Sequence, residues 1–180
     1  MNDVTIPARV RLGQLRVDAR FFVSHLLVNL LIGSPALPRL VRPFLLRMVG
    51  YRVARSTLFP RIVFLGRACV SIDCDAMVNW GVVFDNKAEI SIGARTHVGH
   101  EVLFCTTSHE LGNGQKRAGG GFSSPIVVGA GCWIGARTII LPGVQVGNGC
   151  VIAAGSVVTS DCEANALYAG VPAVIKKRFS

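Results

Sequence analysis

A six-residue period governs the second half of the chain. From residue 128 to residue 158, every sixth residue is Val or Ile, and the fifth residue of each hexad is small or β-branched. The opening residues are Val128, Ile134, Ile140, Val146, Ile152 and Val158. The fifth residues are Cys132, Thr138, Val144, Cys150, Ser156 and Cys162. One large and one small inward side chain in six residues predict a short strand followed by a corner.

The same period extends upstream, through openings at Ile92, Val98 and Phe104. Before residue 92 the opening position is no longer Val, Ile or Phe, while the fifth position of each hexad stays apolar. The degraded openings are Ala68, Cys74, Trp80 and Asn86, and the apolar fifth residues are Ile72, Val78, Phe84 and Ile90. We therefore expect the repeat to run from about residue 67 to about residue 163.

A fixed six-residue period predicts a stacked architecture. A single short strand cannot bury its inward face alone, but stacked coils form one continuous core. Small residues beside the large ones allow the coils to approach closely at their corners. Alternation by itself would also suit an antiparallel sandwich. The regularity of the period favours an all-β fold in which the chain winds as a parallel β-helix.

Composition and charge narrow the class of protein. The 180 residues are 51% apolar and only 16% charged, which is typical of one ordinary folded domain. The net charge of +9 suggests an anionic partner. Helix-turn-helix cues, zinc-finger spacings and basic residues interleaved with aromatics are missing, so we expect no nucleic-acid partner. A phosphorylated cofactor or an anionic membrane surface suits the charge at least as well.

The cysteines and the N-terminal region indicate the cellular compartment of the protein and its relation to membranes. Six cysteines occur without a CxxC pair and without a recognisable secretory signal, so we expect reduced thiols in a cytoplasmic protein. The apolar run from residue 21 to residue 32 is too short to span a bilayer. It could pack on its own protein, on a partner subunit or on a membrane face as a peripheral contact. His25, within this run, is expected to be a packed or half-exposed histidine.

The stretch "WIGARTIILPGVQVGNGCVIAAGSVVTSD" resembles the hexapeptide-repeat acyltransferases, and within them the galactoside and maltose O-acetyltransferase branch. The upstream "LLIGSPALPRLVRPFLLRMVGYRV" resembles the N-terminus of the colanic-acid-type acetyltransferases. The resemblance implies a left-handed parallel β-helix and a homotrimer. It places a mainly helical cap at 1–60, the β-helix at 61–163 with a loop excursion at 110–125, and a tail at 164–180.

The break in the period carries the candidate chemistry. The period holds through His109 and returns near residue 126, so the intervening residues must leave the coil as a glycine-rich loop, and long insertions of this kind are usually functional. Thr107-Ser108-His109 matches the context of the family's catalytic histidine. A neutral imidazole is a suitable general base for a hydroxyl near pH 7. The alternative is a surface histidine, and Glu110 could orient the ring or be solvated.

Other candidates near the break are less decisive. Asn79 matches an asparagine that the resembled branch places near the reactive centre, although it could simply fill a corner. Lys87 stands where the branch has an acceptor-binding carboxylate, so the acceptor is left open. His97 and His100 raise the possibility of the zinc site of the γ-class carbonic anhydrases. Successive hexads point their corners in different directions, so we expect solvated histidines and no metal.

The resemblance implies acetyl-CoA or another acyl-CoA as co-substrate, lying in a groove between adjacent β-helices. The matching positions are Trp133, Ala136, Ala154, Gly155 and Thr159. Ser160 replaces the branch's usual lysine, and Lys177 in the basic tail could supply phosphate contacts instead. A merely solvated tail is the alternative.

The sequence thus predicts an acyl-CoA-dependent O-acyltransferase, most simply an O-acetyltransferase. Its acceptor would be a hydroxyl of a sugar, a glycan precursor or a glycosylated natural product, and no cysteine is required, so Cys105 is expected to be structural. Two alternatives stay open, namely N-acetylation of an amino sugar and a non-catalytic β-helix scaffold.

Overall fold

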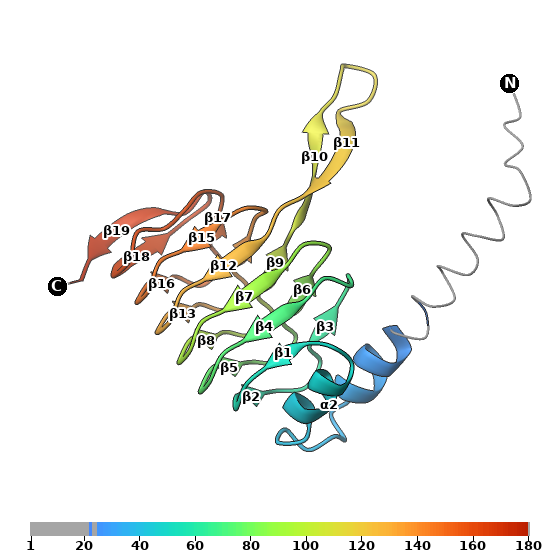
Figure 1. Cartoon of the computed structure of the whole chain (residues 1–180). Coiled ribbons are helices and arrows are strands. Elements are labelled where there is room, and N and C mark those ends of the chain that lie inside the picture. Colours follow the sequence, from blue (N-terminus) through green and yellow to red (C-terminus); the bar gives the residue numbers. More distant parts are fainter. Residues whose placement is uncertain (1–21, 23–24, 180) are drawn as a thin grey trace, which may run out of the picture.

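The structure is a computed structural model that describes residue 22 and residues 25–179. Very short strands, separated by turns, stack along one axis into a solenoid with three parallel sheets (Figure 1). This is the parallel β-helix that the period predicts, and it agrees with the left-handed form that the resemblance implies. The expectations for the first twenty residues lie outside the described part of the chain.

Each sheet forms one face of the solenoid. Face 1 contains β1 (Arg52–Val53), β4 (Val70–Ile72), β7 (Ile90–Ile92), β12 (Ile126–Val128) and β15 (Gln145–Val146). Face 2 contains β2 (Thr57–Leu58), β5 (Met77–Val78), β8 (His97–Val98), β13 (Trp133–Ile134), β16 (Val151–Ile152), β18 (Ala166–Ala169) and the antiparallel β19 (Val174–Arg178). Face 3 contains β3 (Val63–Phe64), β6 (Val83–Asp85), β9 (Leu103–Cys105), β14 (Ile139–Ile140) and β17 (Val157–Val158).

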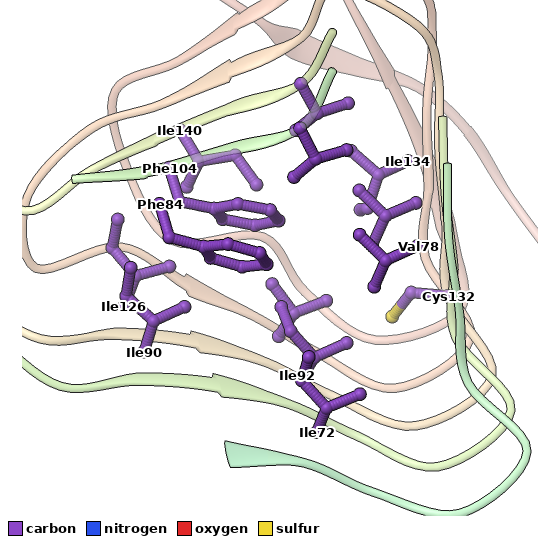
Figure 2. Close-up of a cluster of buried hydrophobic side chains, with 14 of the residues drawn as sticks. Ile72, Val78, Phe84, Ile90, Ile92, Phe104, Ile126, Cys132, Ile134 and Ile140 are labelled. Carbon is purple, nitrogen blue, oxygen red and sulfur yellow. The ribbon is translucent and has the colours of Figure 1, made fainter. Parts of the chain in front are cut away.

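The predicted inward positions form the core. All six opening residues from Val128 to Val158 are at most 2% exposed, and all six fifth residues from Cys132 to Cys162 are at most 5% exposed. Equivalent residues of successive coils lie directly over one another inside the solenoid (Figure 2). Phe84 and Phe104 stack with ring centroids 5.1 Å apart and ring planes 4° from parallel. Burial of these columns of side chains is what holds the coils together.

The upstream phase of the repeat differs from the prediction. Ile72, Val78 and Phe84 do not sit at fifth positions, because each pairs with the residue twenty positions later, which is an opening residue. Downstream, Val128 pairs with Val146, only eighteen residues later. The upstream coils are therefore two residues longer, and the extra residues lie at the corner between face 3 and face 1.

Two buried polar side chains hold the N-terminal end of the solenoid. Asn86 fills the long corner, where its Oδ1 accepts from the Gly66 backbone N–H at 2.9 Å and its Nδ2 donates to the Ala68 carbonyl at 2.7 Å. Arg42 donates to three backbone carbonyls between residues 32 and 58, and burial lowers the pKa of its guanidinium. These contacts satisfy polar groups that burial would otherwise penalise.

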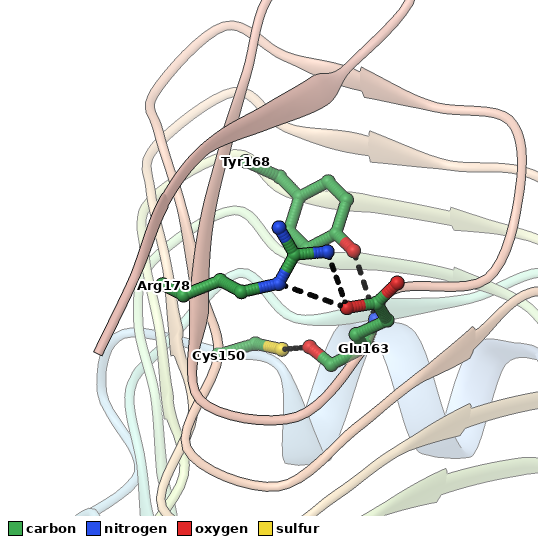
Figure 3. Close-up of polar contacts among 4 residues, drawn as sticks. All are labelled: Cys150, Glu163, Tyr168 and Arg178. Carbon is green, nitrogen blue, oxygen red and sulfur yellow. Dashed lines mark hydrogen bonds and ion pairs between the residues drawn. The ribbon is translucent and has the colours of Figure 1, made fainter. Parts of the chain in front are cut away.

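The two ends of the solenoid are covered differently. At the N-terminal end, η1 (Leu26–Ile32) and α2 (Arg42–Met48) pack Val28, Ile32 and Leu46 into the core. At the C-terminal end, the Glu163 carboxylate forms an ion pair with the Arg178 guanidinium at 2.8 Å. The backbone N–H of Glu163 donates to the Tyr168 hydroxyl at 2.9 Å (Figure 3). Within the described residues, no helix combines the length and the apolar character needed to cross a bilayer.

The observed boundaries differ from the expected ones. The solenoid already begins at β1 and β2, before residue 61, since both strands pair with the next coil. The residues after 163 are not a loose tail, because β18 continues face 2 and β19 folds back on it. Helical structure in the described part therefore ends at Met48, short of the expected cap boundary at residue 60.

Candidate functional site

The break in the period is a β-hairpin rather than a loose loop. β10 (Thr107–Leu111) and β11 (Ala118–Ser123) pair antiparallel and project from the corner between face 3 and face 1 (Figure 1). The excursion therefore begins at residue 107, three residues earlier than expected. The glycines at 119–121 lie in β11, where Gly121 pairs with His109, so they form part of a strand.

His109 lies on β10, opposite Gly121, and its side chain is exposed. Its ring Nδ1 lies 3.1 Å from the carbonyl oxygen of Gly119. A carbonyl oxygen can only accept, so this contact requires a proton on Nδ1. In the neutral imidazole, Nε2 then carries the lone pair. The orienting partner of the ring is thus a backbone carbonyl, and the role considered for Glu110 has no support from these contacts.

A cavity of about 340 Å³ opens beside the imidazole. Its lining residues are Lys87, Thr107, Ser108, His109, Gly121, Phe122 and Ser123. Lys87 enters from the neighbouring coil at the same corner, so a cation stands where the resembled branch has an acid. The cavity thus places hydroxyl side chains and the Lys87 ammonium beside the lone pair of Nε2. Such a cavity suits a polar molecule with a hydroxyl proton that the imidazole can remove.

Asp85 anchors the base of the hairpin. This nearly buried carboxylate accepts a hydrogen bond from the Thr107 hydroxyl, and the Cys105 thiol lies 3.6 Å from it. Thr107 is only two residues before His109 on the same strand. The sequence pattern does not single out Asp85, and its one signal is an acidic residue directly after the core residue Phe84.

A second site lies at the corner between face 2 and face 3. Ala136, Ala154 and Gly155 share an open groove of about 580 Å³, together with His100 and the Glu101–Arg137 ion pair. The Gly155 N–H donates to the Ala136 carbonyl at 2.8 Å, so the small residues of successive coils stack directly. The structure therefore brings together the three small residues that the sequence assigned to one groove.

The other candidate residues lie around this groove or away from it. Trp133 is 62% exposed on face 2, and Lys177 is exposed on β19 at the end of the same face, 5.8 Å from the Phe179 ring. Asn79 lies at the groove's corner two coils before Ala136, where its Nδ2 donates to the Val98 carbonyl at 2.9 Å. Thr159 follows β17 and lies at the opposite corner, on the hairpin's side of face 3.

One chain does not bring the two sites together. The groove lies where face 2 meets face 3, and the hairpin of His109 lies where face 3 meets face 1. The whole of face 3 separates them, and six residues in extended conformation span roughly 20 Å. Asn79 is on the groove's side of this separation, so it does not approach His109 within its own chain.

His97, His100 and the six cysteines do not line the cavity beside His109. His97 is exposed on face 2 beside Trp133, and His100 lines the groove. No metal-binding cluster of His, Cys, Asp or Glu occurs in the described part of the chain. All six cysteines are unpaired, and three are buried. Burial raises the pKa of the Cys132 and Cys150 thiols, and that of Cys162 to about 12, so these thiols are poor nucleophiles.

The comparisons with known proteins agree with this architecture. A family model described as bacterial transferase hexapeptide (six repeats) matches residues 125–160. A protein of Escherichia coli named as a colanic acid biosynthesis acetyltransferase, WcaF, is 30% identical over 135 residues, which cover 74% of this chain and 72% of the relative. The chain belongs to the hexapeptide-repeat acyltransferases.

Other members of the hexapeptide-repeat acyltransferases extend the comparison. The galactoside O-acetyltransferase of Escherichia coli is 31% identical over 113 residues, which cover 63% of this chain and 56% of the relative. The chain spans about half the length of several curated relatives that it matches. A solved hexapeptide-repeat acetyltransferase of Vibrio cholerae, complexed with acetyl coenzyme A, is 28% identical with a TM-score of 0.76, and the match covers 90% of this chain and 88% of that one.

Proposed function

We propose that this protein transfers an acyl group, most simply acetyl, from acyl-CoA to a hydroxyl group. The acceptor would be a sugar, a glycan precursor or a glycosylated natural product. The observation that carries the proposal is the contact between His109 Nδ1 and the Gly119 carbonyl, because it leaves Nε2 as a proton acceptor beside a polar cavity. Relatives named as O-acetyltransferases support a hydroxyl acceptor.

In this mechanism the chain supplies a general base, a hydrogen bond that orients the base, and a polar cavity for the acceptor. Acyl-CoA supplies the acyl group as a thioester. His109 Nε2 accepts the proton of the acceptor hydroxyl as its oxygen attacks the acyl carbon. The imidazolium formed in this way then donates the proton to the departing sulfur. The hydrogen bond from Nδ1–H to Gly119 persists throughout and stabilises the imidazolium, as general acid–base catalysis requires.

The groove between face 2 and face 3 fits the pantetheine arm of acyl-CoA. A thin chain can lie against Ala136, Ala154 and Gly155, where large side chains would obstruct it. Trp133 offers an exposed aromatic surface beside the groove, and Lys177 offers a cation at the end of face 2. Thr159, at the corner of the hairpin, would contact the nucleotide of acyl-CoA bound in the groove of a neighbouring chain. The acetyl coenzyme A complex of the Vibrio relative supports this class of co-substrate.

The separation of the two corners supports assembly as a homotrimer. His109 and the groove of one chain face different directions, so a neighbouring chain must place its own groove against the hairpin. A closed ring of three triangular solenoids satisfies this for every subunit by one repeated contact. Asn79 would then reach the reaction centre from the groove side. Its amide would orient the acceptor or hold the developing oxyanion.

We place this activity in the cytoplasm, where six cysteines without a CxxC pair are expected to remain reduced. The test is release of free thiol from acetyl-CoA in the presence of sugars, glycosides and amino sugars. Hydroxyl-dependent release supports the proposal, and release with amino sugars alone would assign N-acylation instead. If calorimetry shows no binding of acyl-CoA, the remaining interpretation is a non-catalytic scaffold.

A further inference from the structure

The N-terminal helices expose an unusual amount of apolar surface. Of the nineteen large apolar side chains that are exposed in the described part of the chain, ten lie between residues 22 and 49. These are Phe22, Leu26, Leu27, Leu30, Leu31, Leu40, Val41, Phe44, Met48 and Val49. The opposite sides of the same helices are buried on the solenoid through Val28, Ile32 and Leu46. The outward side of these helices is thus a second apolar face that the described residues do not cover.

The charge around this face has a single sign. Between Asp18 and Asp73 the sequence contains no acidic residue, whereas residues 25–72 contain seven arginines. Arg42 is buried, and the other six are exposed: Arg39, Arg47, Arg52, Arg55, Arg61 and Arg67. Among the described ion pairs, Arg55 alone of these has an acidic partner, Asp75 on the next coil. Exposed apolar side chains in one segment with arginines, five of which have no acidic partner among the described ion pairs, are typical of segments that lie in a membrane interface.

We propose that this surface, the cap face of residues 22–67, docks on an anionic lipid bilayer. The apolar side chains would enter the headgroup and upper acyl region, and the arginines would contact the lipid phosphates. The proposed contact is peripheral, because the exposed side chains of the cap face would reach only the headgroup and upper acyl region. A second copy of this chain suits the face poorly, because pairing two cap faces would bring acid-free, arginine-rich surfaces together. Nucleic acid would satisfy the arginines and leave the apolar side chains in water.

The cap face lies close to the base of the hairpin along the solenoid axis. Arg67, Lys87 and Thr106 occupy the same corner on three successive coils, the last at the base of the hairpin. Stacked coils are about 4.8 Å apart, so the base of the hairpin lies about 10 Å along the solenoid axis from Arg67. A docked cap would therefore hold the cavity of His109 close to the lipid headgroups. Docking itself does not depend on the proposed acyltransfer.

Vesicle co-sedimentation of the full-length protein tests the inference. We expect binding to vesicles that contain phosphatidylglycerol, much weaker binding to pure phosphatidylcholine, and a loss of binding as ionic strength rises. Arg39→Gln with Arg61→Gln should weaken binding roughly 30-fold, since each basic residue near the surface contributes about a fivefold factor. Leu40→Ser with Met48→Ser, at positions 82% and 70% exposed, should weaken binding while leaving the fold intact.

A matched control lies at the other end of the solenoid. Val174→Ser with Lys176→Gln removes one exposed apolar and one basic side chain from β19, and it should leave vesicle binding unchanged. Equal binding to both kinds of vesicle, or equal effects of the cap and control variants, would overturn the inference. Absence of vesicle binding, with cap variants that change the oligomeric state in sedimentation velocity, would overturn it in favour of a second copy. Thiol release with a water-soluble acceptor is measured separately, so the two proposals can fail independently.

Discussion

The carboxylate of Asp85 accepts a hydrogen bond from the Thr107 hydroxyl across one coil of the solenoid. Asp85 ends β6 in the core-facing part of one coil, and Thr107 begins the hairpin that projects from the next coil. The contact joins the rigid stack to the strand that carries His109. The position of the imidazole therefore depends on a buried acid that takes no part in the proposed proton transfer.

The first prediction concerns this contact. Asp85→Ala leaves the Thr107 hydroxyl without its charged partner, and such a loss typically costs about 1.5–3 kcal/mol. We expect turnover to fall at least tenfold while the KM for acyl-CoA stays unchanged, since the groove lies at another corner. Steady-state kinetics separate the two. Asp73→Ala removes an exposed carboxylate from the solenoid and is the control. Equal turnover in both variants would refute the positioning role.

The second prediction concerns the acyl-CoA groove. Ala154→Leu should fill part of the space beside Ala136 and raise the KM for acyl-CoA by about tenfold or more, as a larger side chain displaces bound ligand atoms. The control is Ala164→Leu, at an exposed alanine outside this groove. Circular dichroism should be the same for both variants. If Ala154→Leu binds acyl-CoA as tightly as the parent protein in calorimetry, the groove is assigned wrongly.

The third prediction concerns the close stacking of the coils. A Cβ added at Gly135 would lie 2.4 Å from the backbone nitrogen of Ala154 on the next coil, whereas one added at Gly120 would meet nothing within 4 Å. Gly135→Ala should therefore destabilise the protein by about 1–3 kcal/mol or more through overpacking. Gly120→Ala should change stability little. Denaturant unfolding measures both, and equal midpoints would contradict the described stacking.

The fourth prediction concerns pH. Burial, with smaller effects from Cys150 and Asp161, raises the pKa of Cys162 from an ordinary 9.0 to about 12. Between these values the unfolded chain has lost the thiol proton and the folded chain still holds it, so stability falls as pH rises. We expect the melting temperature under reducing conditions to drop above pH 9. The slope should be shallower in Cys162→Ala, and identical slopes would show that this thiol does not contribute.

The periodic part of this fold could be predicted from the sequence, because the side chains that pack inside the solenoid recur at the period of the sequence. Every opening residue from Val128 to Val158 is buried, as predicted. Confirmed in the same way is the family to which the chain belongs. The core positions follow from residues that repeat at a fixed spacing, so a count along the chain is enough to place them, whereas the family was inferred from the resemblance of its motifs.

The features that the sequence did not yield depend on departures from the period. Two additional residues at the corner of Asn86 shift the upstream phase, and a count that assumes constant coils assigns Ile72 and Val78 to the wrong position. The pairing of β11, which contains the glycines at 119–121, with β10 depends on contacts between separate segments, and composition does not reveal it. Asp85 acts through a contact twenty-two residues away in sequence, which no local pattern marks.

The imidazole of His109 is the centre of the proposed chemistry, and its removal is the most direct test. Acetyl-CoA thiol release should be measured with an acceptor that the parent protein uses, comparing His109→Ala with His97→Ala, an exposed histidine on face 2. We expect His109→Ala to lose about 10²–10⁴-fold in turnover with an unchanged melting temperature, as the loss of a general base predicts, and His97→Ala to retain most of its turnover. Near-normal turnover in His109→Ala would contradict the account.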